Sequence, residues 1–339
     1  MSQRQQRRSL LGATLGVALW PCVARAAMEV ETTQEDRFAA LPDYPFAAHY
    51  TQVGEGLRMH YLAEGPAEGR TVVLLHGQPT WSYLWRAIVP PLAAAGHRVL
   101  APDLIGFGKS SKPTQRGDYS YALHVQWVRQ WLDSQPLRDA TLVVHDWGGL
   151  IGLRLLAERP NLFARLAVLD TSFNVGSEWD SLPPAYRDGL QRWQRLLREQ
   201  PGLRFSEVVR LHARRALSAA ELAAYDAPFP DDRYNQGARA MSQLIPMRPD
   251  DPGAAENRAA EETLRRWSGD LLLAFSQGSE RLHPGQRQRM REMFGRARLW
   301  ADISLRGAGH FSPEDQPQAL TALLLDFVAG RTAPPTAIT

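Results

Sequence analysis

Cysteine is almost missing from this sequence: Cys22 is the only one in 339 residues. A single cysteine excludes an intrachain disulfide framework and a metal site built from several thiolates. Beyond the N-terminal segment, no apolar run approaches the roughly 20 residues that a membrane-spanning helix needs. We expect Cys22 to be removed with that segment, so the mature protein has no thiol for catalysis.

An excess of positive charge is also absent from most of the chain. The formal net charge is +3, but four of the 39 basic residues lie within residues 1–26, which contain no acid. The remainder carries 35 basic and 36 acidic residues. This balance gives no support for nucleic-acid binding.

Residues 1–26 have the layout of a secretory signal peptide. Basic residues precede an apolar stretch from Leu10 to about Ala24, and the small-residue pattern of a cleavage site ends at Ala26. The start "RRSLL" resembles the twin-arginine export signal. An uncleaved membrane anchor is the alternative, but the apolar stretch is short and Pro21 interrupts it. We expect a periplasmic or secreted protein without a stable membrane anchor.

Short apolar segments predict the strands of a parallel sheet. They are apolar along their whole length, as strands covered on both faces are. Helical patterns lie between them, at residues 120–135 and 149–160, and residues 48–66 favour an antiparallel pair of strands. This alternation predicts an α/β doubly wound domain. The six expected core strands are residues 71–77, 98–103, 141–146, 165–171, 270–276 and 299–305.

The interval between the fourth and fifth of these strands is charged and helical, with no convincing strand. A helical insert of this length is typical of a cap over the carboxyl edge of the sheet, where open α/β sheets bind ligands. The tail after residue 330 is rich in proline and threonine, and we expect it to be disordered. The predicted division is 27–171 and 246–330 for the two parts of the core, 172–245 for the cap and 331–339 for the tail.

The stretch "TLVVHDWGG" places Asp146 at a strand-to-helix turn. Gly148 and Gly149 keep this turn tight and let the following helix pack closely. The amino terminus of that helix stabilises an ionised carboxylate. An aspartate at a helix start also commonly caps the helix, so this segment alone leaves capping and nucleophilic attack both open.

Two other segments favour the nucleophile. "HGQP", at residues 76–79, follows another predicted strand, where backbone N–H groups can face a substrate. The amides of Gln78 and Trp147 would then form an oxyanion hole. In "RGAGHFSPED", His310 follows the last core strand, where a general base would reach the same edge of the sheet.

With "HGQPTWSYLWR", "APDLIGFGKSSKP", "TLVVHDWGG" and "AYDAPFPDDRY", the chain from about residue 45 to 328 resembles the haloalkane dehalogenases, particularly the branch with a tryptophan pair for halide. The resemblance implies an α/β-hydrolase fold, with a mostly parallel central sheet and an inserted helical cap. It implies that Asp146 displaces halide from a saturated carbon and that His310 activates water against the resulting ester. A haloalkane and water would be the only partners, with no cofactor or metal, and we expect a monomer.

The same resemblance assigns halide binding to indole N–H groups, which are donors only. Trp147 would be one donor and Trp193 of the cap the other, with Trp179 as the fallback for the second. Trp193 could instead be a buried core residue of an amphipathic helix. The apolar substrate pocket would be lined by Leu150, Leu190, Phe229 and Pro230.

The sequence departs from this branch at two positions. The acid that orients the histidine should follow the strand at 270–276, but Ser279 stands at the matching position. Another branch places the acid after the preceding strand, which matches Asp170, so we assign the acid to Asp170 with Glu280 as the fallback. Gln78 replaces the usual Glu or Asn, and its side-chain amide offers an N–H to the halide.

Three rival functions remain. An epoxide hydrolase would use the same three catalytic groups, with proton donors among Tyr186, Tyr225 and Tyr234 of the cap. Such enzymes usually have an aromatic residue at the position of Gln78 and a glycine at Val144. A haloacid dehalogenase would need cations beside the nucleophile, where Trp147 stands. A non-catalytic carrier would not need an assembled elbow, oxyanion segment and histidine.

Overall fold

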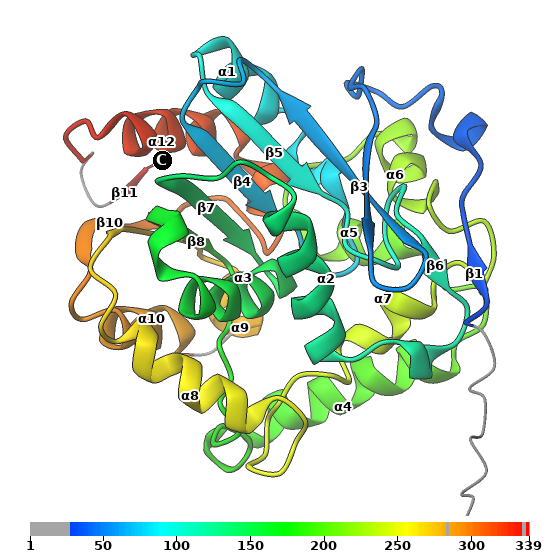
Figure 1. Ribbon diagram of the computed structural model, residues 1–339. Helices are drawn as coiled ribbons and strands as arrows, with labels where there is room; N and C mark the ends of the chain where they lie inside the picture. Colours follow the sequence, from blue (N-terminus) through cyan, green and yellow to red (C-terminus); the bar gives the residue numbers. More distant parts are fainter. Residues whose placement is uncertain (1–27, 283–284, 334–336, 339) are drawn as a thin grey trace, which may run out of the picture.

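The computed structural model describes residues 28–282, 285–333 and 337–338 (Figure 1). The expected signal peptide, with Cys22, lies outside these residues. Among the helices of the described ranges, none has the length and apolar character needed to cross a membrane.

A nine-stranded sheet forms the centre of the fold, in the order β11-β10-β9-β8-β7-β4-β5-β3-β2. β3 pairs antiparallel with β2 and with β5, and the remaining neighbours pair parallel. The expected fold class and the six core strands are confirmed. The strands are β2 (His49–Val53), β3 (Leu57–Glu64), β4 (Thr71–Leu75), β5 (Arg98–Pro102), β7 (Ala140–His145), β8 (Phe163–Leu169), β9 (Asp270–Ser276), β10 (Arg298–Leu305) and β11 (Ala337–Ile338).

Two short strands lie outside these expectations. β1 (Val30–Glu31) pairs antiparallel with β6 (Lys112–Pro113) in a separate two-stranded sheet. At the other end of the chain, β11 pairs with Ser304 and Leu305 of β10. This pairing adds one short parallel strand at that edge of the sheet, and the expected disorder of residues 331–339 stays a prediction.

Helices cover both faces of the sheet (Figure 1). α1 (Val89–Ala94) and α12 (Pro317–Ala329) lie together on one side. α3 (Trp147–Glu158) lies on the other side between its neighbours α2 (Tyr121–Asp133) and α8 (Ala254–Leu264), with α10 (Gln286–Met293) beyond. The short helices are η1 (Glu35–Phe38), η2 (Ser82–Trp85), η3 (Arg116–Asp118), η4 (Pro160–Leu162), η5 (Trp179–Ser181), α9 (Ser279–Leu282) and α11 (Ser312–Asp315).

Four helices between β8 and β9 form the segment that we call the cap: α4 (Pro184–Glu199), α5 (Phe205–His212), α6 (Ala219–Asp226) and α7 (Gln236–Met241). Two side chains of the loop after β4 donate hydrogen bonds to the cap. The side-chain amide of Gln78 donates to the Ala238 carbonyl, and Trp81 Nε1 donates to the Ala224 carbonyl at 3.2 Å. Because that loop leaves the carboxyl end of a parallel strand, the cap covers the edge of the sheet where the candidate site residues lie.

Candidate active site

Asp146 sits at a strained turn between β7 and α3, with φ 51° and ψ −125°. Small neighbours make this turn possible. A Cβ on Gly77 would lie 2.2 Å from Asp146 Oδ1, and a Cβ on Gly149 would lie 2.0 Å from Thr171 Oγ1. The Thr171 hydroxyl donates to the Asp146 carbonyl at 2.5 Å. Glycine and threonine therefore fix the backbone of the elbow and leave its carboxylate at the sheet edge.

The backbone N–H of Gln78 donates to Asp146 Oδ1 at 2.6 Å. The Trp147 amide nitrogen lies at the same turn, since it is 2.5 Å from where a Gly77 Cβ would stand. Both expected oxyanion donors thus lie around the elbow. The side-chain amide of Gln78 donates to the Ala238 carbonyl of α7, so one of its two N–H groups is used to hold the cap.

His310 follows β10 and brings its Nε2 to 3.4 Å from Asp146 Oδ2. The imidazole is only 7% exposed. Burial by itself lowers the pKa of His310, but the hydrogen bond and charge of Asp146, followed by the charge of Asp170, raise that pKa above its usual value. The pair therefore resembles a base held ready beside an anionic nucleophile.

Asp170 follows β8 and is fully buried, with φ 38°. Burial raises its pKa to about 6, against the lowering effects of the His310 charge, the Ser276 N–H and the Ser312 and Ser279 hydroxyls. Ser279, at the position where the resemblance led us to expect the acid, is buried, and its hydroxyl is one of the groups that lower the pKa of Asp170. The backbone of Glu280, the fallback acid, lies next in α9, and its side chain is outside the described part.

His145, directly before the nucleophile, was missed by sequence reasoning. Its Nε2 lies 2.7 Å from the His310 carbonyl oxygen, and the two rings are 4.9 Å apart between centroids. Burial lowers the pKa of His145 to about 3, so the ring is neutral and its Nε2–H donates. A histidine one position before a strand-end nucleophile was the available signal.

Trp147 and Trp179 both have Tyr121 as a neighbour, whereas Trp193 lies on α4 of the cap. Trp147 is 2% exposed and meets Tyr121 edge-on at 5.7 Å between ring centroids. Trp179 lies beneath the Arg248 guanidinium at 4.4 Å and, with Tyr121, lines a cavity of about 350 Å³. Trp193 is half-buried on α4 and packs against the core, and within the described ranges no hydrogen bond or ring contact joins it to Trp147.

The four residues expected to line the apolar substrate pocket differ in burial. Leu150 is buried on α3, and Leu190 is half-buried on α4. Phe229 is half-buried and contacts Phe107 edge-on, 6.5 Å between centroids. Pro230 is exposed to solvent, so it is withdrawn from the expected lining. Its neighbour Phe229 faces the core, and the chain turns outward directly after it.

Comparison with known proteins identifies the family. The model of the alpha/beta hydrolase fold family matches residues 70–317. A haloalkane dehalogenase from Psychrobacter cryohalolentis is 41% identical over 305 residues, which cover 89% of this chain and 98% of that protein. One from Mycobacterium marinum is 44% identical over 305 residues, covering 88% and 100%. The chain belongs to the haloalkane dehalogenase family.

Solved structures agree with this assignment. The haloalkane dehalogenase DpaA from Paraglaciecola agarilytica NO2, described as tetrameric, matches with a TM-score of 0.76 and 32% identity. The match covers 85% of this chain and 95% of that one. Haloalkane dehalogenase DbeA from Bradyrhizobium elkani USDA94 matches with a TM-score of 0.72 and 27% identity, covering 84% and 98%. The expected family resemblance is therefore confirmed.

Two of the tyrosine hydroxyls that an epoxide hydrolase would need donate to other protein groups in this member of the dehalogenase family. The Tyr225 hydroxyl donates to Glu314, and the Tyr186 hydroxyl donates to the Leu282 carbonyl at 2.8 Å. Burial, together with the charge of Asp146, raises the pKa of Tyr186 to about 12. Tyr234 lies beside exposed Arg233. The epoxide hydrolase alternative is not favoured.

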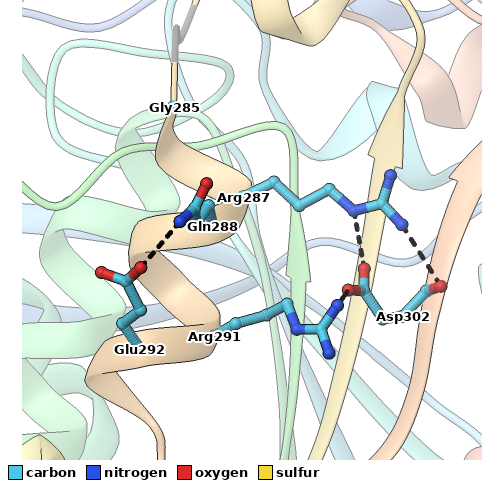
Figure 2. Close-up of a pocket in the computed structure, with 6 residues that line it drawn as sticks. All are labelled: Gly285, Arg287, Gln288, Arg291, Glu292 and Asp302. Carbon is cyan, nitrogen blue, oxygen red and sulfur yellow. Dashed lines mark hydrogen bonds and ion pairs between the residues drawn. The ribbon is translucent and has the colours of Figure 1, made fainter.

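A separate surface hollow of about 650 Å³ lies on α10 and β10 (Figure 2). Its two arginines, Arg287 and Arg291, both bind Asp302, at 2.6 and 2.9 Å. None of its lining residues belongs to the elbow or to the His310 loop. Over the described ranges, no group of three or more His, Cys, Asp or Glu side chains is arranged to hold a metal ion.

Proposed function

We propose that the protein hydrolyses haloalkanes to an alcohol, a halide ion and a proton through a covalent ester on Asp146. The observation that carries the proposal is the arrangement of the Asp146 carboxylate: Oδ1 accepts the Gln78 N–H at 2.6 Å, and Oδ2 lies 3.4 Å from His310 Nε2. One oxygen is held by an amide, and the other faces the base. This suits a nucleophile whose ester is later hydrolysed.

In the first step, Oδ2 of Asp146 attacks the carbon that bears the halogen, and the halide leaves with the electron pair of the broken bond. A carboxylate needs no base for this attack because it carries no proton. The indole N–H of Trp147 and a second indole, from Trp193, bind the departing anion in a desolvated pocket.

In the second step, His310 takes a proton from water and the resulting hydroxide attacks Cγ of Asp146. The oxyanion forms on Oδ1, where the Gln78 and Trp147 amides stabilise it. The bond between Cγ and the alkoxy oxygen then breaks, the alcohol leaves with the proton held by His310, and the carboxylic acid formed on Asp146 releases its proton to solvent. Asp170 holds the imidazole and stabilises its charged form during this step.

The purified mature protein, incubated with 1-bromobutane, 1,2-dibromoethane and styrene oxide, tests the proposal by assays for bromide and for diol. We expect bromide from the two bromoalkanes and no diol from styrene oxide. The D146N variant should release no bromide. Diol alone would establish the epoxide alternative instead. Neither product would favour the non-catalytic carrier.

We further propose that the protein is exported, that its signal peptide is cleaved after Ala26, and that the mature protein is a monomer. The basic and apolar pattern of residues 1–26 supports export. Replacement of Arg7 and Arg8 by lysine should leave the protein in the cytoplasmic fraction, whereas unchanged export would contradict a twin-arginine signal. Light scattering of the mature protein tests the monomer, because a mass of four chains would match the tetramer described for DpaA.

A further inference from the structure

We propose that Asp315 is a positioning residue that fastens the His310 loop to the cap and so holds the general base in place for ester hydrolysis. This inference rests on the proposed function, because it assigns a task to His310. It concerns a carboxylate that does not itself reach the reacting atoms.

Asp315 joins two separate pieces of backbone with one carboxylate. Its Oδ2 accepts the N–H of Gly309, next to the base, at 2.7 Å. Its Oδ1 accepts the N–H groups of Arg214 and Arg215, directly after α5 of the cap, at 2.7 and 2.8 Å. Bonds from backbone N–H groups to an ionised carboxylate are stronger than neutral ones. Cap and base loop are therefore held by the same side chain.

The two backbones also touch directly. The N–H of His310 donates to the His212 carbonyl of α5 at 3.1 Å. A Cβ on Gly309 would lie 2.1 Å from that same carbonyl oxygen, far inside van der Waals contact. Glycine at position 309 thus permits the approach that Asp315 secures.

A buried ionic cluster makes α11 a firm support for Asp315. The residue before it, Glu314, is 2% exposed and binds Arg86 of the core. Arg215 of the cap donates to the same carboxylate at 2.6 Å, and the Tyr225 hydroxyl donates to it as well. Core, cap and α11 meet at Glu314, so Asp315 acts from a fixed position.

Loss of the Asp315 bonds should slow only the second step, the hydrolysis of the ester. The His310 backbone is held on its other side by His145, whose Nε2–H binds the His310 carbonyl at 2.7 Å. Releasing the Asp315 side would let the imidazole shift relative to Asp146, and displacements near 1 Å can cost about 100-fold in rate. Alkylation of Asp146 needs no base, so the loss should appear in ester hydrolysis.

The D315N variant tests the inference. The carboxylate of Asp315 accepts N–H groups of the base loop on one oxygen and of the cap on the other, whereas asparagine has only one oxygen that can accept. With 1-bromobutane, we expect the pre-steady-state bromide burst to stay within about twofold of wild type, while steady-state turnover falls about tenfold or more. The alkyl-enzyme should accumulate, and mass spectrometry of the intact protein measures this. The G309A variant should give the same signature by pushing the loop from the His212 carbonyl.

The matched control is E207Q, which removes an exposed carboxylate of α5 that pairs with Arg210 at 2.7 Å, and it should behave as wild type. Equal losses of burst and turnover in D315N and G309A, or wild-type hydrolysis in both, would overturn the positioning role. A wild-type enzyme that never carries substrate carbon on Asp146 would instead remove the proposed function, and this inference with it.

Discussion

The Asp170 carboxylate at the end of β8 accepts the backbone N–H of Ser276 at the end of β9, 2.7 Å from Oδ1. The acid proposed for the triad is therefore oriented by the neighbouring strand. The hydroxyl of Ser279, a few residues further, faces the same carboxyl group. Positions 170 and 279, the two at which we expected different branches of the family to carry the acid, thus lie close together.

This convergence predicts that the acid can be moved. D170N should lower steady-state turnover about 100-fold or more, since the imidazolium formed during hydrolysis loses its counter-charge. The double variant D170N/S279D should recover part of that loss. Turnover of 1-bromobutane by both variants, with E280Q as the control, measures this. A wild-type rate in D170N with a large loss in E280Q would give the role to Glu280.

The raised pKa of Asp170 predicts an opposite effect on stability. Its folded pKa of about 6 lies above the ordinary 3.8, so the folded state binds the proton more tightly than the unfolded state. Ionisation therefore destabilises the fold as the pH rises through this interval, by up to about 3 kcal/mol above it. D170N should melt at a higher temperature than wild type at pH 8, and the gain should shrink toward pH 4. Thermal melts at both pH values check this, and an equal gain at both would contradict it.

The pH dependence of the two steps should differ. In the free enzyme, Asp146 raises the pKa of His310 above its usual value. Formation of the ester removes that negative charge, so the pKa of His310 should fall in the intermediate. The acid limb of kcat, which includes ester hydrolysis, should therefore follow His310 in the ester, whereas kcat/KM, which reports the base-free alkylation, should not follow the titration of His310. Acid limbs of kcat and kcat/KM at the same pH would contradict this.

The second halide donor is tested by two matched substitutions. W193F should slow bromide release several-fold by removing an indole N–H, a loss on the order of 1 kcal/mol. W179F should leave release unchanged if Trp193 is the donor, although Trp179 lines the cavity beside Tyr121. Stopped-flow bromide release measures both. Slow release in W179F alone would transfer the role to Trp179.

Local patterns sufficed for much of the fold. Continuous apolar segments predicted the core strands, because a sheet covered on both faces requires them. The two glycines after Trp147 predicted the elbow, since the turn leaves no room for side chains at Gly148 and Gly149. His310 followed from its place after the last core strand.

Contacts between distant segments could not be read in the same way. The bond from Ser276 to Asp170 spans 106 positions, and the bonds from Arg214 and Arg215 to Asp315 depend on where the cap lies. The exposure of Pro230 and the pairing of β11 likewise depend on tertiary packing. Sequence spacing gives the residues of the site, and the fold decides which of them face each other.

The most direct test follows the substrate carbon itself. An H310Q variant, which lacks the base, should be treated with 1-bromobutane and digested with trypsin, and the peptide that ends at Arg154 should be fragmented. We expect Asp146, and not Asp139 of the same peptide, to carry a butyl group in place of a proton. Bromide release by the wild type with no alkylated Asp146 in the variant would contradict the mechanism.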